Sequence, residues 1–194
     1  EIKDIRAQYP GKKIIFSMGR LVSYKGYEYL ISAMTHLPEE YVLLIGSDGP
    51  LKEQLQQQIE ELGLKERVTL LGGLKEEKKQ AYFGACDVFC LSSVMKTEAY
   101  AIVLVEAMSL GRPIVATEIP ESGVSWVNAH EVSGLNVPVR DPEALAEAIH
   151  KICGDPELWK RYSQGARQRY DDTFTKDEMI NNLIETYTQL LNNN

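Results

Sequence analysis

Cysteine is scarce in this sequence: among 194 residues there are three, Cys86, Cys90 and Cys153, and there is no CxxC pair. An odd number of cysteines without metal-ligand spacing argues against both a disulfide framework and a zinc site. The sequence also lacks a DxD motif, and its three histidines are scattered. We therefore predict reduced thiols inside a core and no metal site.

Long apolar runs and an excess of positive charge are also missing. No run approaches the roughly 18 apolar residues of a membrane span, and the polar start of the chain does not resemble a signal peptide, so we expect a cytoplasmic domain. Lysine and arginine total 21 against 28 aspartate and glutamate, a formal net charge of −7. Because this charge repels nucleic acid, we expect no nucleic-acid partner, and a phosphate site must use a few local cations.

Short apolar runs that alternate with amphipathic ones fill most of the chain. The expected strands are residues 12–18, 40–46, 67–72, 87–93, 112–117 and 133–139. The expected helices are residues 27–37, 51–63, 75–86, 101–111, 141–153, 155–170 and 175–192. Strands without polar alternation, joined by helices, indicate a parallel sheet covered on both faces. We therefore predict one α/β domain over residues 1–194, a Rossmann-like doubly wound sheet with C-terminal helices, whose last residues, 192–194, fray.

Helix punctuation supports these boundaries. Asp141 precedes a proline and a glutamate, the pattern of a helix N-cap followed by proline at the first helical position. Gly63 and Gly111 follow amphipathic runs, where glycine commonly ends a helix in the left-handed conformation. These residues predict one helix start and two helix ends.

Loops that follow the strands of such a sheet are where ligands bind. The first of these loops, residues 19–26, carries Arg20 and Lys25 between two glycines and just before a helix. A guanidinium fork, a lysine and free helix amides together suit a diphosphate. A solvated basic turn explains the same residues equally well, because neither Gly-x-Gly spacing nor a Walker lysine pattern is present.

Two carboxylates in and before an apolar helix raise a stronger question. Glu106 lies inside the run IVLVEAM and Glu98 lies eight residues earlier. Because burying an unpaired carboxylate is costly, Glu106 needs either a polar ligand or an ion-pair partner, for which Arg112 is the structural candidate. On one helix the two carboxylates would stand about 12 Å apart, beyond the roughly 5–9.5 Å of glycosidase pairs. Two separate roles fit better, with the fork of Glu106 matching the vicinal hydroxyls of ribose.

The two glutamates resemble the E-x7-E signature of retaining, family 4 type glycosyltransferases of GT-B architecture. The resemblance covers nearly the whole chain. GRLVSYKGYEYLI is similar to the arginine-lysine loop of that family, GSDGPLKEQL to its G-D-G-P turn, and DVFCLSSVMKTEAYAIVLVEAMSLGRPIVAT to its most specific block. The chain is thus identified as resembling the C-terminal, donor-binding domain of such an enzyme.

The resemblance implies a site for a nucleoside-diphosphate hexose, with UDP-sugar or GDP-sugar as the donor substrate and no further cofactor. It assigns Arg20 and Lys25 to the diphosphate and Glu106 to the ribose. It makes Glu98 the catalytic residue, which orients the sugar or supports positive charge near the anomeric carbon without acting as a covalent nucleophile. Backbone amides that would contact phosphate or sugar oxygens are those of Ala99, Tyr100, Ala101 and Ile102.

The sequence departs from the family pattern in two places. Ala99 and Ala101 flank the aromatic residue where glycine is usual, so a methyl group crowds a ligand while leaving the N–H available. The stretch EIPESGVSWVNAHEVSGLNV resembles the variant found among O-antigen and capsule sugar transferases. This variant favours a role in cell-surface polysaccharide synthesis.

The resemblance further implies a second, amino-terminal lobe that binds a glycan or lipid-linked acceptor. We expect residues 1–194 alone to bind donor without transferring sugar, and the full-length enzyme to associate peripherally with the inner face of the membrane. Two alternatives stay open: a non-catalytic nucleotide-binding or interaction lobe of the same fold, and a sugar-nucleotide epimerase.

Overall fold

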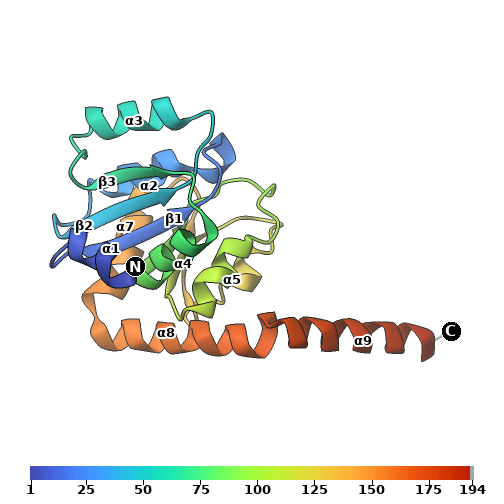
Figure 1. The fold of residues 1–194 in the computed structure, drawn as a ribbon. Helices are drawn as coiled ribbons and strands as arrows, with labels where there is room; N and C mark the ends of the chain where they lie inside the picture. The colour runs from blue at the N-terminus through green and yellow to red at the C-terminus, as the bar shows by residue number, and fades with distance from the viewer. Residues whose placement is uncertain (193–194) are drawn as a thin grey trace.

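A six-stranded parallel sheet forms the centre of the domain in the computed structural model, which describes residues 1–192 (Figure 1). The strands are β1 (Lys13–Met18), β2 (Tyr41–Gly46), β3 (Val68–Gly72), β4 (Val88–Leu91), β5 (Ile114–Glu118) and β6 (Gly134–Pro138). Their order in the sheet is β3-β2-β1-β4-β5-β6, and every neighbouring pair is parallel. The predicted doubly wound, Rossmann-like α/β fold is confirmed.

Helices cover both faces of this sheet. They are α1 (Ile2–Gln8), α2 (Tyr27–Ala33), α3 (Lys52–Glu61), α4 (Glu76–Ala85), α5 (Ile102–Ser109), α6 (Val124–Val127), α7 (Pro142–Gly154), α8 (Pro156–Arg169) and α9 (Lys176–Asn192), with a 3-10 turn η1 (Ser23–Lys25) and a π-helical turn η2 (Tyr170–Phe174). Residues of α2, α3 and α7 pack in one core layer, and residues of α4 and α5 in the other. Successive residues of β1 alternate between the layers: Ile15 lies in the first, and Ile14 and Phe16 lie in the second.

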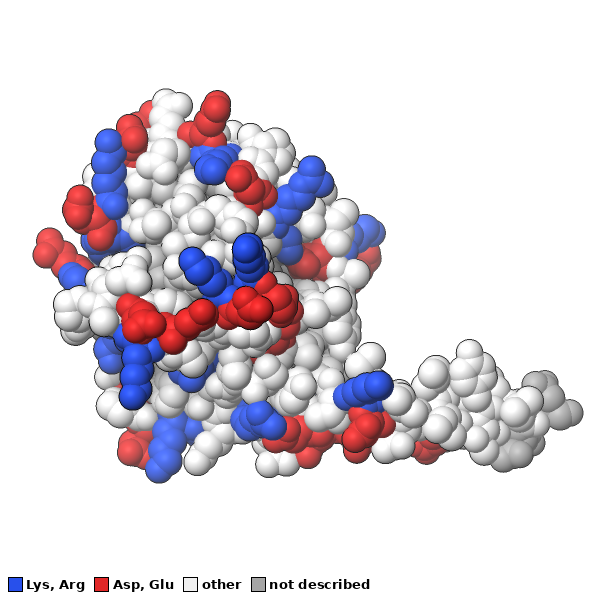
Figure 2. Space-filling view, viewed as in Figure 1, with Lys and Arg blue, Asp and Glu red and all other residues white. Residues whose placement is uncertain are grey.

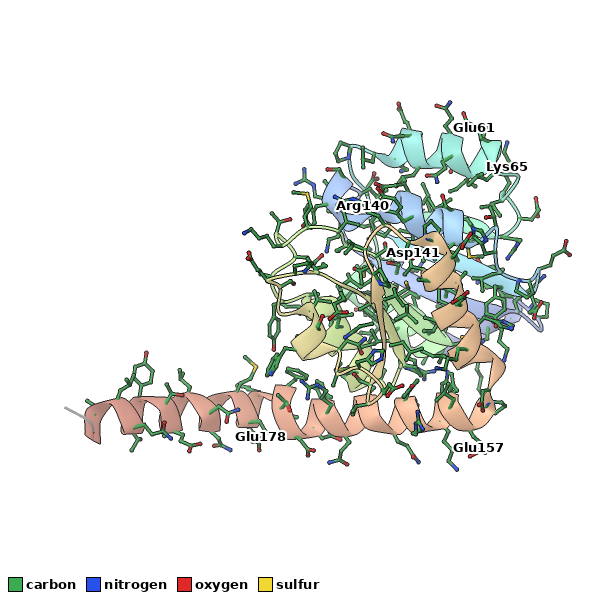
Figure 3. The ribbon with its side chains drawn as sticks, turned by 180° about the vertical axis from the view of Figure 1, so that it is seen from behind. Glu61, Lys65, Arg140, Asp141, Glu157 and Glu178 are labelled. Carbon is green, nitrogen blue, oxygen red and sulfur yellow. The ribbon has the colours of Figure 1, made fainter. Side chains whose placement is uncertain are left out.

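The expected caps are present. The Asp141 carboxylate accepts a hydrogen bond of 2.9 Å from the amide of Ala144 and begins α7 (Figure 3). Gly63 and Gly111 adopt φ angles of 68° and 61°, the left-handed conformation that ends a helix. The three residues predicted to start or end helices therefore do so in the structure.

Several details differ from the sequence-based expectations. The stretch before β6, where no helix was expected, contains the short helix α6, and a π-helical turn joins α8 to α9. In Figure 1, α8 runs along the domain and α9 continues beyond it. Met179, Leu183 and Tyr187 of α9 are exposed. Asn192 ends α9, while Asn193 and Asn194, which were also expected to fray, lie outside the described residues.

Acidic and basic side chains alternate over the face seen in Figure 2. Within residues 1–192, no helix combines the length and apolar character needed to cross a membrane.

Candidate functional site

The loops after β1 and β4 meet at the point where the order of the sheet reverses. The chain leaves β1 toward β2 and β3, and later returns to place β4 on the other side of β1. Two hydrogen bonds join the loops: the Val94 amide donates to the Tyr24 carbonyl at 2.8 Å, and the Ser92 hydroxyl donates to the Lys25 carbonyl at 2.9 Å. Open α/β sheets bind ligands at the carboxyl ends of the strands at such a reversal.

A buried ion pair spans this junction. The Lys25 ammonium, from the loop after β1, donates to Oε2 of Glu98, from the loop after β4. Each of these side chains is only 10% exposed. The Ser93 hydroxyl donates to the same carboxylate oxygen at 2.6 Å. In the described part of the chain, Oε1 of Glu98 accepts no hydrogen bond, which leaves that oxygen available to another donor.

Glycines allow the two loops to approach this closely. Gly26 has a φ of 63°, and a Cβ atom there would lie 2.3 Å from the Ser92 carbonyl oxygen. A Cβ atom at Gly19 would lie 3.1 Å from the side chains of both Lys25 and Tyr27. The Tyr27 hydroxyl donates to the Gly19 carbonyl at 2.8 Å, and burial raises the pKa of Tyr27, which favours the donating form. The glycine-bounded loop is thus a close-packed support for Lys25.

Arg20 differs from Lys25 although both lie in this loop. Arg20 is exposed, and its guanidinium makes no hydrogen bond or ion pair with any other residue among 1–192. The structure therefore brings Lys25 to Glu98 and leaves Arg20 at the surface. The guanidinium keeps all its donors free for an anion.

Four consecutive amides stand free beside the buried pair. Those of Ala99, Tyr100, Ala101 and Ile102 donate to no protein group in the described residues. They lead into the N-terminus of α5, where unpaired N–H groups and the helix dipole favour an anion. Ala101 has a φ of 56°, in the left-handed region that favours glycine, whereas Ala99, two residues earlier, does not adopt a positive φ.

Sequence reasoning missed the turn that supports these amides. The Gly123 amide donates to the Ala99 carbonyl at 2.8 Å, and the Ser122 hydroxyl donates to the Glu98 carbonyl. A Cβ atom at Gly123 would lie 2.7 Å from that Ala99 oxygen. The serine and glycine of the stretch EIPESG were the available signal. Their position after β5 brings them to the same edge of the sheet.

The side chains of Tyr100 and Ile102 point away from the core. They are 39% and 66% exposed, and the Tyr100 ring lies 6.2 Å from the ring of Trp126, measured between centroids. The predicted contact with phosphate or sugar oxygens therefore concerns the backbone amides of these two residues and not their side chains.

Glu106 is paired with Lys79 and not with Arg112, which was the candidate for a structural ion pair. The Lys79 ammonium donates to Oε1 of Glu106 at 2.6 Å and lies 2.8 Å from Oε2 of Glu76. Arg112 instead donates to the carbonyl of Cys86 at 3.1 Å. Lys79 belongs to the charged run KEEKK at residues 75–79, a pattern typical of a solvated helix face, yet its side chain is 13% exposed. Burial opposes its charge, but the hydrogen bonds to Glu106 and Glu76 outweigh burial and raise the pKa of Lys79.

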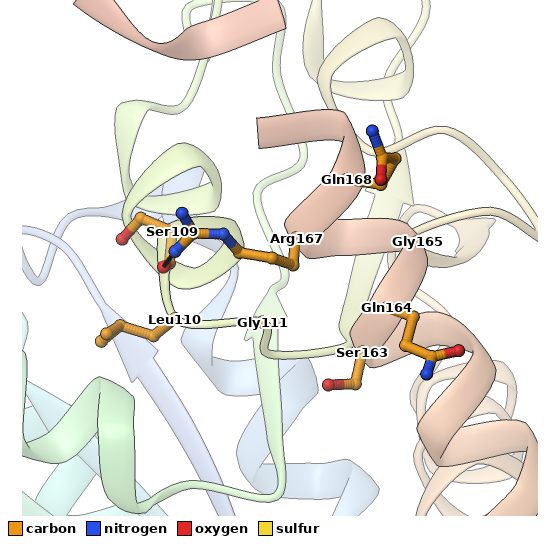
Figure 4. A pocket seen from close by; sticks show the side chains of 8 residues that line it. All are labelled: Ser109, Leu110, Gly111, Ser163, Gln164, Gly165, Arg167 and Gln168. Atoms are coloured by element: carbon orange, nitrogen blue, oxygen red, sulfur yellow. Dashed lines mark hydrogen bonds between the residues drawn. The ribbon is translucent and has the colours of Figure 1, made fainter. Parts of the chain in front are cut away.

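A hollow lies away from these residues, at the C-terminal end of α5. It has a volume of about 870 Å³. Figure 4 shows Ser109, Gly111 and Ser163 along it, with Arg167 reaching across to donate to the Ser109 carbonyl at 2.7 Å. None of the predicted site residues lines this hollow. The residues 1–192 contain no cluster of three or more histidine, cysteine or acidic side chains able to hold a metal, and metal independence stays a prediction.

Comparison with known proteins places the chain in a family. Residues 1–169 match the family described as glycosyl transferases group 1. The chain is 32% identical over 183 residues to O-antigen chain mannosyltransferase C of Escherichia coli, a match that covers 93% of this chain and 48% of the relative. It is also 32% identical over 174 residues to the lipopolysaccharide core biosynthesis glycosyltransferase LpsD of Rhizobium meliloti, covering 90% of this chain and 49% of the relative.

A solved structure agrees with these relatives. The crystal structure of Anabaena HepE in complex with UDP superposes with a TM-score of 0.87 and 26% sequence identity, covering 97% of this chain and 52% of HepE. The chain thus spans about half the length of these three proteins. The match over residues 1–169 and the shared fold show that the chain belongs to the glycosyl transferases group 1 family, of GT-B type.

Proposed function

We propose that this domain is the C-terminal, donor-binding lobe of a retaining, family 4 type glycosyltransferase. In this proposal residues 1–194 bind a UDP-sugar or GDP-sugar, and an amino-terminal lobe binds a glycan or lipid-linked acceptor. The observation that carries the proposal is the Lys25–Glu98 pair, buried across the reversal of the sheet beside four free amides. Supporting it, HepE was crystallised with UDP and with UDP-glucose.

The proposed chemistry divides the residues between two ends of the donor. Departure of the nucleotide leaves negative charge on the β-phosphate, and Arg20, Lys25 and the amides of α5 stabilise that charge. Glu98 acts on the sugar through its free Oε1, where it orients hydroxyls or supports positive charge near the anomeric carbon. Glu106 binds the ribose hydroxyls with its carboxylate fork. In this proposal, neither the negative charge on the β-phosphate nor the positive charge near the anomeric carbon requires a metal ion or a further cofactor.

The proposed biological setting is cell-surface polysaccharide synthesis with a hexose as the transferred sugar. The names of the two relatives, which refer to O-antigen and to lipopolysaccharide core, support this setting. We place the enzyme in the cytoplasm, with peripheral association of the full-length protein at the inner face of the membrane. We also expect the isolated domain to transfer no sugar, and turnover by the purified chain would contradict this.

A second candidate is a non-catalytic lobe that binds nucleotide or another protein. The observation in its favour is that both glutamates already hold a lysine, so neither carboxylate needs a ligand for its stability. A sugar-nucleotide epimerase is distinguished by a separate assay, because it would convert the donor to its epimer with no acceptor present.

Thermal unfolding with added nucleotide tests the proposal. UDP, GDP, ADP and their sugar conjugates are added to the parent chain, to Glu106→Ala and to Glu61→Ala, an exposed helix glutamate that serves as the control. A ligand at about 100 times its Kd stabilises by roughly 2.7 kcal/mol, which raises the midpoint by about 5–10 °C for a domain of this size. We expect one nucleotide to stabilise the parent and Glu61→Ala but not Glu106→Ala. If none raises the midpoint at millimolar concentration, the donor-site proposal fails.

A further inference from the structure

Lys79 holds two carboxylates of very different exposure. Its ammonium lies 2.6 Å from Oε1 of Glu106 and 2.8 Å from Oε2 of Glu76. The side chain of Glu106 is 23% exposed, whereas that of Glu76 is 69% exposed. An exposed ion pair contributes little because water screens it, so the contact with Glu106 dominates.

The contact fixes one half of the Glu106 carboxylate. Oε1 is occupied by Lys79, and Oε2 accepts no hydrogen bond among residues 1–192. A carboxylate can accept about four hydrogen bonds in its plane. The contact therefore leaves Oε2 without a partner among the described residues and restricts the direction in which it points.

Lys79 and Glu106 come from two different helices, each of which follows a strand of the sheet. Lys79 lies on α4, which follows β3, and Glu106 lies on α5, which follows β4. The first turn of α5 also holds the free amide of Ile102. A carboxylate held in one orientation loses less freedom when it binds a ligand than a freely rotating one does.

We propose that Lys79 is a positioning residue that sets the preference of this site for ribonucleotides over 2′-deoxyribonucleotides. It does so by holding Oε1 of Glu106, so that the open oxygen faces the hydroxyls of the nucleotide sugar. This inference rests on the proposed function, in which Glu106 binds the ribose. Lys79 itself touches Glu106 and not the sugar.

Calorimetric titration of the chain with UDP, GDP and ADP, and with the 2′-deoxy form of whichever binds, tests the proposal. One hydrogen bond to a charged group corresponds to about a tenfold preference for the ribonucleotide in the parent. In Lys79→Met we expect this preference to fall to about twofold, through weaker binding of the ribonucleotide and a change below twofold for the deoxynucleotide. Lys79→Arg retains the positive charge and is expected to restore most of the preference.

Two further variants separate positioning from general effects. Glu77→Gln, an exposed neighbour on α4, serves as the matched control and is expected to leave both affinities within twofold of the parent. Glu76→Gln removes the competing carboxylate, so the preference is expected to stay or to increase. The double variant Lys79→Met with Glu106→Gln leaves neither charge of the pair unpaired. Compared with Glu106→Gln alone, it is expected to change the affinity for nucleotide less than twofold.

Distinct results would overturn the inference. Equal weakening of the ribonucleotide and deoxynucleotide by Lys79→Met would show that Lys79 acts as a general phosphate cation. Additive losses from Lys79→Met and Glu106→Gln would show that it does not act through Glu106. If the parent binds none of the three nucleotides at millimolar concentration, the proposed function fails together with this inference. Binding by the parent with no effect of Lys79→Met refutes the inference alone.

Discussion

Replacing Glu98 by alanine should destabilise the domain strongly, because it leaves the ammonium of Lys25 without its partner. Both side chains are 10% exposed, and the Ser93 hydroxyl loses its acceptor in the same step. Removing one partner of a buried pair typically costs about 3–5 kcal/mol. Because each side chain keeps some contact with water, we expect the lower end, about 3 kcal/mol.

The effect is large enough for ordinary unfolding experiments. For a domain of this size each kcal/mol lowers the midpoint by about 2–4 °C, so Glu98→Ala should unfold about 6–12 °C below the parent. Urea unfolding at pH 7, followed by circular dichroism, gives the free energy of unfolding independently. Both measurements need no nucleotide, so they test the buried pair apart from the proposed function.

Two matched variants identify the cause. The double variant Lys25→Met with Glu98→Gln removes both charges at similar volume and should recover at least half of the loss. Lys96 and Glu121 form an ion pair of 2.9 Å in which the side chains are 71% and 76% exposed. Lys96→Met should therefore change the free energy of unfolding by less than about 1 kcal/mol.

A small effect would refute the reasoning. If Glu98→Ala lies within about 1 kcal/mol of the parent, like Lys96→Met, the Lys25 ammonium reaches water or another acceptor once Glu98 is removed. The Lys25–Glu98 pair would then affect the free energy of unfolding no more than a surface ion pair does. The same conclusion would follow if the double variant were less stable than Glu98→Ala.

Three further predictions concern the backbone, a helix cap and a thiol. In urea unfolding, the free energy of unfolding of Ala101→Gly should be about 1 kcal/mol higher than that of Ala99→Gly, since of the two alanines only Ala101 occupies the left-handed region. Equal free energies would show that the backbone of Ala101 carries no strain. Asp141→Ala should cost about 1 kcal/mol through loss of the α7 cap, against less than 0.5 for Glu143→Gln in the same assay; a cost matching that of Glu143→Gln would exclude a capping role. Burial raises the pKa of the Cys86 thiol from 9.0 to about 12. The resulting contribution of this thiol to the free energy of unfolding is therefore complete below pH 9 and falls as pH rises above it. Under reducing conditions, the parent should therefore lose roughly 1 kcal/mol more than Cys86→Ala between pH 7.5 and 10, and equal losses would contradict burial as the cause.

The fold could be predicted because its signals are local. Apolar runs such as residues 40–46 lack polar alternation, and β2 is buried at every position. Helix ends were encoded by single residues, including Asp141 and Gly63. Helix α6 escaped prediction because four residues in a serine-rich stretch give no periodic pattern.

The site could be predicted only as a set of residue types, because its contacts join distant parts of the chain. Lys25 and Glu98 lie 73 residues apart, and sequence reasoning gave them separate ligands without pairing them. Lys79 lies 27 residues from Glu106, in a charged run whose spacing is typical of a solvated helix face. Arg112 was the candidate for a structural ion pair with Glu106, but the packing of α4 against α5 brings Lys79 to Glu106 instead.

The observed pairing also changes how charge at the candidate site is counted. Lys25 is offset by Glu98, and Lys79 by Glu106, so the two pairs together contribute no net charge. Of the two cations predicted to hold the diphosphate, Arg20 and Lys25, only Arg20 has no carboxylate partner among residues 1–192, and the free amides before α5 add their dipoles. The paired carboxylates hold both lysines in place while cancelling their charge. This pairing also means that Lys25 has to share its ammonium between Glu98 and a phosphate, which ties donor binding to the catalytic carboxylate in the proposed mechanism.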